Sequence, residues 1–176
     1  MPKKMLNIAK TWWPVLFAPV FITAELAAQE VETLVIPEIV AYGADTPVNV
    51  RVKRECRLEE KISQFIQEYT KGTYAKIVHE KPSSGTYHVL TAEIIDVLGR
   101  GGGAWSGYKS ITIKGQLTDH TGKVLGTFQA RRYSGGGAFA GYKGTCSILG
   151  RCTKALGKDV AYWLQAPDMN ATLGDY

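Results

Sequence analysis

Hydrophobic positions follow two different periods along the chain, and together they predict strands interleaved with helices. Residues 31–42 (VETLVIPEIVAY) are rich in β-branched side chains, which indicates a first strand bent at Pro37. Residues 48–53 (VNVRVK) alternate apolar and polar positions and would extend or follow that strand. Between residues 57 and 70 the apolar positions instead recur every three or four residues, which predicts an amphipathic helix closed by Gly72.

Four further strand patterns follow, separated by turn sequences. Pro82–Gly85 and Asp119–Gly122 are the turns, and the Asp and Gly of the second supply the backbone angles of a hairpin. The second of the four strands is apolar on both faces, as in a buried central strand. The predicted strands are Tyr74–Glu80, Tyr87–Leu98, Tyr108–Thr118 and Lys123–Tyr133.

A second amphipathic helix closes the pattern and ends near Leu164. Its apolar stripe contains Leu149, Cys152, Leu156, Val160 and Trp163, with Lys154 and Lys158 on the other side. Residues 166–176 are polar and predict a flexible tail. This order predicts a single α+β domain over residues 29–165, with a four- or five-stranded, mostly antiparallel sheet and two helices packed on one face.

The first 28 residues have the three parts of a cleavable bacterial signal peptide. A basic start is followed by the apolar run Trp12–Ile22 and by small residues ahead of a cut expected after Ala28. The alternatives are a retained membrane anchor or neither, but eleven residues with two prolines are short of the roughly 20 that a span needs. We therefore expect a periplasmic or secreted protein with no stable membrane span after cleavage.

The composition and net charge of the chain argue against one class of partner, nucleic acid. Of the 176 residues, 45% are hydrophobic and 21% charged, which is typical of a globular protein. The net charge of +5 falls to +3 without the leader. Because nucleic-acid binders carry clustered Lys and Arg, this mild excess in an exported protein argues against a nucleic-acid partner.

Three cysteines remain after cleavage, and an oxidising compartment would pair two of them. Cys56 and Cys146 each lie just ahead of a predicted helix, whereas Cys152 falls on an apolar stripe. This favours a Cys56–Cys146 disulfide with Cys152 as a buried thiol. A Cys146–Cys152 bridge closing a small loop is nearly as well supported.

The chain contains one internal repeat, in a region that holds 14 of its 19 glycines. GGGAWSGYKS at 101–110 matches GGGAFAGYKG at 135–144, and we call these segments the twin loops. They flank the predicted hairpin, so they should lie side by side at one edge of the sheet. The candidate binding residues are Trp105, Tyr108, Lys109, Phe139, Tyr142 and Lys143.

Two interpretations of the twin loops remain open. Aromatic and cationic side chains on loops held by a rigid scaffold suit sugars, peptides or a partner protein. Alternatively, the glycines permit tight loops whose aromatic side chains cap the core. A self-association surface would combine the two.

Signatures of catalysis are missing from the sequence. A phosphate-binding loop needs Gly directly before Lys, and here Tyr108 intervenes before Lys109; Ser106 and Ser134 lie outside a G-x-S-x-G motif. His79, His88 and His120 fall on separate strands or turns without metal-ligand spacing. We therefore expect no enzyme activity, no metal and no cofactor.

The segments GQLTDHTGKVLGTFQARRYSGGG and RCTKALGKDVAYWL combine a strand, a Thr-Gly turn, a strand, a Gly-rich loop and a closing helix with Asp159 ahead of Trp163. Over about residues 85–165 this resembles a family of bacterial exported and envelope proteins known only as a domain of unknown function. The resemblance implies fold and location but no catalytic residues, and this chain lacks the lipid-modified Cys of lipoproteins. The layout is also similar to ring-forming periplasmic subunits of secretion and polysaccharide-export assemblies.

The leading hypothesis is a non-enzymatic periplasmic accessory or assembly protein that contacts another envelope protein, or itself, through the twin loops. The alternative is a small-ligand or glycan-binding module that uses the same loops. A hydrolase without a visible signature is the third hypothesis.

Overall fold

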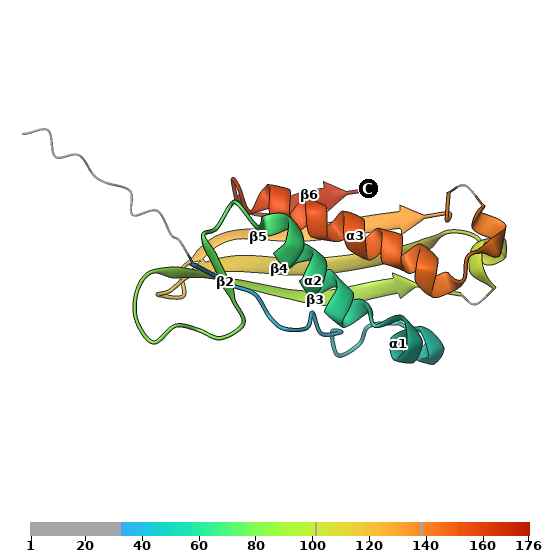
Figure 1. Cartoon of the computed structure of the whole chain (residues 1–176), viewed down its shortest axis with the longest axis horizontal. Helices are drawn as coiled ribbons and strands as arrows, with labels where there is room; N and C mark the ends of the chain where they lie inside the picture. Colours follow the sequence, from blue (N-terminus) through green and yellow to red (C-terminus); the bar gives the residue numbers. More distant parts are fainter. Residues whose placement is uncertain (1–32, 101, 138) are drawn as a thin grey trace, which may run out of the picture.

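The chain forms an α+β fold built on a six-stranded mixed sheet, seen in a computed structural model that describes residues 33–100, 102–137 and 139–176 (Figure 1). The predicted signal peptide lies outside the described residues. In spatial order the strands are β2 (Lys76–Val78), β1 (Thr33–Val35), β3 (Tyr87–Leu98), β4 (Lys109–Asp119), β5 (Val124–Ser134) and β6 (Ala171–Gly174). The α-helices are α1 (Val50–Cys56), α2 (Leu58–Thr70) and α3 (Thr145–Trp163).

The antiparallel centre of the sheet, β3–β4–β5, follows the predicted strands closely. The turn between β4 and β5 also forms as predicted, because one oxygen of the Asp119 side chain accepts the backbone N–H groups of Thr121 (2.8 Å) and Lys123 (3.0 Å). A shift in register interrupts the β3–β4 pairing between Ile94 and Asp96. At that point Gly43 donates to the Ile94 carbonyl (2.9 Å), so the segment after β1 lies beside β3.

The prediction of four or five mostly antiparallel strands is wrong in both respects. Strand β1 runs parallel to both of its neighbours, β2 and β3, and β6 runs parallel to β5. The reason is that parallel strands need a long crossover, and the helices provide it. Helices α1 and α2 connect β1 to β2, and α3 connects β5 to β6.

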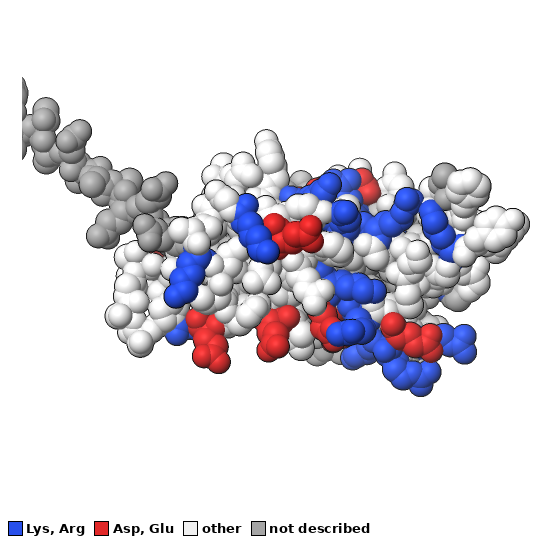
Figure 2. Space-filling model, viewed as in Figure 1, with Lys and Arg blue, Asp and Glu red and all other residues white. Residues whose placement is uncertain are grey.

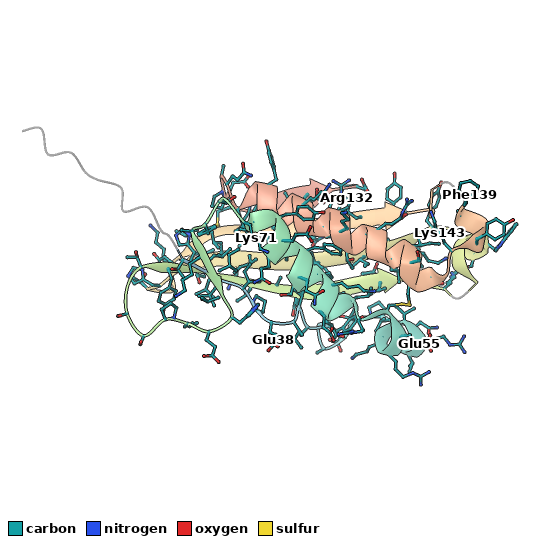
Figure 3. All side chains as sticks on the ribbon, viewed as in Figure 1. Glu38, Glu55, Lys71, Arg132, Phe139 and Lys143 are labelled. Atoms are coloured by element: carbon teal, nitrogen blue, oxygen red, sulfur yellow. A yellow bond between two sulfur atoms is a disulfide. The ribbon has the colours of Figure 1, made fainter. Side chains whose placement is uncertain are left out.

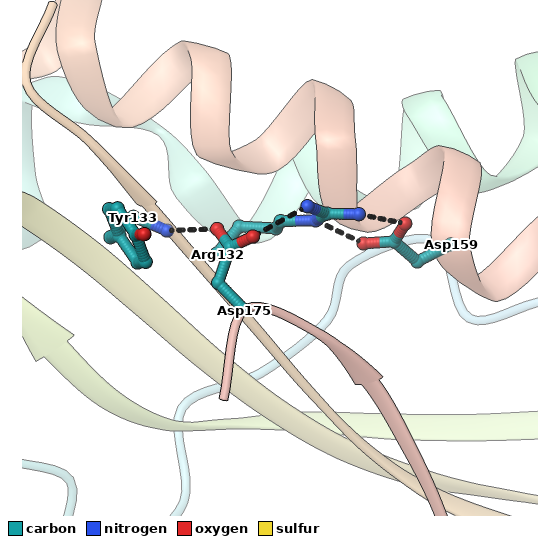
Figure 4. A network of polar contacts seen from close by, with 4 residues as sticks. All are labelled: Arg132, Tyr133, Asp159 and Asp175. Carbon is teal, nitrogen blue, oxygen red and sulfur yellow. Dashed lines mark hydrogen bonds and ion pairs between the residues drawn. The ribbon is translucent and has the colours of Figure 1, made fainter.

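The C-terminal residues form strand β6 where the sequence predicts a flexible tail. Strand β6 is held by backbone pairing from Phe128 to Arg131 and by an ion-pair network around Arg132 (Figure 4). The Arg132 guanidinium donates two 2.7 Å hydrogen bonds to Asp159 on α3 and one of 2.7 Å to Asp175 just past β6. These carboxylates raise the pKa of Arg132, with the hydrogen bonds to Asp159 the largest cause.

Residues 48–53 were predicted as a strand, but helix α1 begins among them. The side chain of Asn49 accepts the N–H of Arg51 (2.9 Å), which caps the helix start. Val52 and Cys56, four residues apart, point into the core, while Val50 is exposed. The alternation of three valines is therefore compatible with a strand, and the cap together with the i, i+4 burial selects the helix.

Helices α2 and α3 cover one face of the sheet, as predicted (Figure 1). The predicted stripe of α3 is buried, and Trp163 packs against Phe128 of β5 with ring centroids 4.8 Å apart. The two helices pack tightly at Gly157, where an added Cβ would lie 2.5 Å from the Cβ of Phe65. A glycine is needed there to let the helices meet.

Cys56 and Cys146 form the predicted disulfide, which joins the end of α1 to the first turn of α3. Cys152 is a free buried thiol, also as predicted. Burial is the main cause that raises the pKa of Cys152 to about 12, with a smaller effect of the Asp175 charge. A thiol in this state is inert, because the thiolate is the reactive form.

Gly157→Ala should destabilise the fold by about 2–4 kcal/mol, because the added methyl group collides with α2. The matched control is Gly150→Ala in the same helix, where nothing lies within 4 Å of the added Cβ. That variant should gain up to about 1 kcal/mol from helix propensity. Urea unfolding of both variants measures the difference, and equal effects would contradict the close packing.

Cys152 should resist an aromatic disulfide reagent at pH 8 in the folded, oxidised protein and react fully after unfolding in denaturant. The reason is its burial together with the raised pKa. Counting released thiolate by absorbance gives the result, with one thiol expected only after unfolding. A full thiol equivalent in the folded protein would contradict the burial of Cys152.

Candidate functional site: the aromatic tip

The twin loops lie side by side at one end of the sheet, as the sequence predicts. Each contains a short 3-10 turn, Gly103–Ser106 in the first and Ala140–Tyr142 in the second, and the two turns contact each other. The indole N–H of Trp105 donates to the carbonyl oxygen of Gly141 (3.2 Å), which links the loops directly. In Figure 1 the loops extend beyond the strands, beside the start of α3.

Gly103 makes the close approach of the loops possible. A Cβ added there would lie 2.3 Å from the carbonyl oxygen of Lys143, and the φ of Gly103 is +57°. Residues with a side chain rarely adopt such an angle. Behind the loops, the Arg100 carbonyl accepts hydrogen bonds from the hydroxyls of Ser106 (3.3 Å) and Thr145 (3.0 Å), which ties the first loop to α3.

Three aromatic side chains of the twin loops project into solvent, and we call them the aromatic tip. The exposed fractions are 86% for Trp105, 81% for Phe139 and 92% for Tyr142. Phe139 also has a left-handed backbone (φ 59°), which costs a non-glycine residue on the order of 1 kcal/mol. Figure 3 places Phe139 at the far end of the molecule, clear of the core. The loops hold these rings outward.

Tyr108, the fourth predicted aromatic residue, lies at the boundary between the tip and the sheet. It is 66% exposed, and its ring meets the edge of the Tyr133 ring on β5, with centroids 5.7 Å apart at 72°. It therefore belongs to the sheet surface as much as to the tip.

The two lysines of the repeat fasten the loops instead of being presented beside the aromatic rings. Lys109 is fully buried, and its ammonium donates to the Ser106 hydroxyl (2.9 Å) and the Gly107 carbonyl (2.8 Å). Burial, followed by the charge of Arg100, lowers the pKa of Lys109. Lys143 donates to the Gly136 carbonyl (2.9 Å), which also accepts from Arg151 (2.7 Å).

The surroundings of the tip carry positive charge. Residues 97–118 and 120–158 contain no Asp or Glu. In Figure 2 the end of the molecule is uncharged, with Lys and Arg side chains next to it. On α1, Glu55 pairs with Arg51 and Arg54. The tip is thus an aromatic surface next to cations.

The three histidines lie on separate elements away from the tip. Nδ1 of His88 is 2.8 Å from the Tyr74 hydroxyl, and Nδ1 of His79 is 3.0 Å from the Ile36 carbonyl oxygen. Burial lowers the pKa of His88, against the charge of Asp119, and His120 lies in the β4–β5 turn. Among the residues described, no three His, Cys, Asp or Glu side chains are grouped to hold a metal ion. None of the helices described is both long and apolar enough to cross a membrane.

No protein-family model matches the chain, and no curated protein matches it. Among solved structures it is similar to the PelC dodecamer from Paraburkholderia phytofirmans, at 12% identity and a TM-score of 0.46, over 73% of this chain and 88% of that one. It is also similar to a minor lipoprotein from Acinetobacter baumannii, at 9% identity and a TM-score of 0.39, over 77% and 93% of the two chains. Similarity at this level carries no information about function.

Gly103→Ala should destabilise the protein more than Gly107→Ala and separate the twin loops. Both positions have positive φ, +57° and +83°, so both variants bear the strain of that backbone. Only the first adds a collision with the Lys143 carbonyl, since nothing lies within 4 Å at Gly107. Thermal melting should therefore separate the two by about 1–3 kcal/mol.

The indole N–H resonance of Trp105 reports loop contact directly in the same experiment. It should shift in the Gly103 variant, where the hydrogen bond to Gly141 is lost, and stay in place in the Gly107 variant. Identical melting and identical indole shifts in the two variants would contradict the described contact.

Proposed function

We propose that this chain is a non-enzymatic accessory or assembly protein of the bacterial cell envelope, and that the aromatic tip is its contact surface for a second copy or another envelope protein. The observation that carries the proposal is the exposure of Trp105, Phe139 and Tyr142 at one end of the molecule. Together they expose on the order of 500 Å² of aromatic side chain, at the upper end for the largest apolar patch of a monomer. Patches of this size mark interaction surfaces.

The construction of the loops supports binding over capping of the core. Rings that cap a core are buried by what lies beneath them, whereas the three tip rings are at least 81% exposed. The loops are pre-ordered by the Trp105–Gly141 hydrogen bond and by the lysines that reach their own carbonyl groups. Pre-ordering reduces the entropy lost on binding. Aromatic side chains are also the residues most enriched at protein contacts.

The proposed location rests on two features. The Cys56–Cys146 disulfide persists in an oxidising compartment and not in a reducing cytoplasm. The sequence of residues 1–28 has the pattern of a secretory signal peptide. A periplasmic or secreted protein satisfies both.

Light scattering on the purified, oxidised protein tests self-association. A discrete multimer is expected, and the triple variant Trp105→Ala, Phe139→Ala, Tyr142→Ala should be monomeric with unfolding free energy within about 1 kcal/mol of the parent. The matched control is Tyr162→Ala, an equally large ring that is 76% exposed near the end of α3. It should keep the multimer.

Two other results of this experiment would change the interpretation of the tip. A monomer at every concentration would exclude self-association and leave a different envelope protein as the partner. A triple variant that unfolds would contradict the proposal, because the rings would then be part of the core.

A further inference from the structure

The uncovered face of the sheet holds a small pocket next to the tip. Pairing of Ser110 with both Leu98 and Tyr133 places these three side chains on one face. Their neighbours Val97 and Ile111 are buried on the other face, in the core beneath the helices. The pocket has a volume of about 330 Å³ and is lined by Leu98, Tyr108, Ser110, Arg131 and Tyr133. This lies at the lower end for ligand pockets and suits a single ring.

Two polar groups of this pocket, one buried and one exposed, have no side-chain hydrogen bond or ion pair with a described residue. Ser110 is 2% exposed, and its hydroxyl has no hydrogen-bond partner among the residues described. A buried polar group without a partner is uncommon and costly, and a ligand is one way to satisfy it. Arg131 lies on this face of the sheet, opposite to its neighbour Arg132, and its guanidinium forms no ion pair with a described residue.

The remaining walls of the pocket are aromatic and apolar. The rings of Tyr108 and Tyr133 meet edge to face. Tyr108 is 66% exposed and Tyr133 is 55% exposed. Exposed ring surfaces of this kind stack on the flat face of a second ring. The Tyr108 ring packs closely against Gly135, where an added Cβ would lie 3.3 Å from a carbon of that ring.

We propose that this pocket binds a six-membered ring that carries a carboxylate. The ring packs on Tyr108 and Tyr133, and the carboxylate accepts two hydrogen bonds from Arg131. The side chains of Tyr108 and Tyr133 shift on binding, so that a polar substituent of the ring reaches the buried Ser110 hydroxyl. Planar guanidinium groups recognise carboxylates in this two-pronged manner. A sugar acid and an aromatic acid share this chemistry. The site uses none of the three exposed rings of the aromatic tip, and Tyr108 lies at the boundary between the two.

Nuclear magnetic resonance titrations of the oxidised, full protein with glucuronate, 3-hydroxybenzoate and glucose test the proposal. At least one of the two acids should cause saturable shifts at the backbone of Ser110, Arg131 and Tyr133, with a Kd on the order of 0.1–1 mM. Glucose, which lacks the carboxylate, should bind at least about tenfold more weakly. Preference for glucuronate or for 3-hydroxybenzoate identifies the source of the ring.

Four variants separate binding from folding. Arg131→Gln and Tyr133→Ala should each weaken the preferred acid about tenfold. Lys114→Gln removes the same charge from a side chain on the same face that pairs with Glu93, and it should leave the Kd within about twofold. Ser110→Ala should weaken binding while the melting temperature stays the same or rises, because an unpaired buried hydroxyl is removed.

Three results would overturn the proposal. One is the absence of saturable shifts with both acids, and another is equal binding of glucose and glucuronate. The third is an equal effect of Arg131→Gln and Lys114→Gln, which would indicate general attraction of charge. The triple variant of the tip should keep the affinity of the parent, so failure of this proposal and failure of the tip proposal are distinguishable.

Discussion

Helix α3 packs along the β4–β5 hairpin and contacts α1, α2 and β6 as well, so it holds the other elements together. The 19 residues of α3 span about 28 Å at 1.5 Å per residue, most of the length of the hairpin. Near its far end Trp163 packs on Phe128, in its middle Gly157 admits α2, and at its start Cys146 is bonded to Cys56. One helix thus positions the sheet, the second helix and the loops.

The twin loops inherit their position from this arrangement. They leave the two ends of one hairpin and meet above the start of α3, where the disulfide fixes the helix. The amino groups of Lys109 and Lys143 bind carbonyl groups of the loops. The rings of Trp105, Phe139 and Tyr142 are exposed to solvent. The result is a rigid end of the molecule with an exposed aromatic surface. Contact through that end would leave the neighbouring sheet pocket open to a small ligand.

Local patterns predicted much of this fold from sequence. The helix at 57–70, the strand at 87–98, the hairpin turn and the Cys56–Cys146 pairing are confirmed, because periodicity and turn chemistry act over short distances. Strand β6 was missed because its stabilising contacts are distant in sequence: it pairs with β5, and Asp175 just past it binds Arg132, 43 positions away. The start of α1 was missed because three alternating valines read as a strand, although Asn49 ahead of them was a capping signal.

The candidate site was also predicted only in part, because the sequence pattern shows local features and not contacts between distant residues. The repeat correctly indicated that the loops would lie together, but it could not indicate that Lys109 turns inward to its own loop. Ser110, Arg131 and Tyr133 form a pocket only through strand register, so nothing in their local sequence singled them out.

Photo-cross-linking from the tip tests whether it is a contact surface in the cell. Two variants of this chain would each carry one benzoylphenylalanine, in place of Tyr142 (92% exposed) or of Tyr162 (76% exposed). We expect one discrete adduct from position 142 in intact cells, either a dimer of this chain or a complex with one envelope protein. We expect no discrete adduct from position 162. Equal labelling at the two positions, or none at position 142, would show that the tip is not the contact surface.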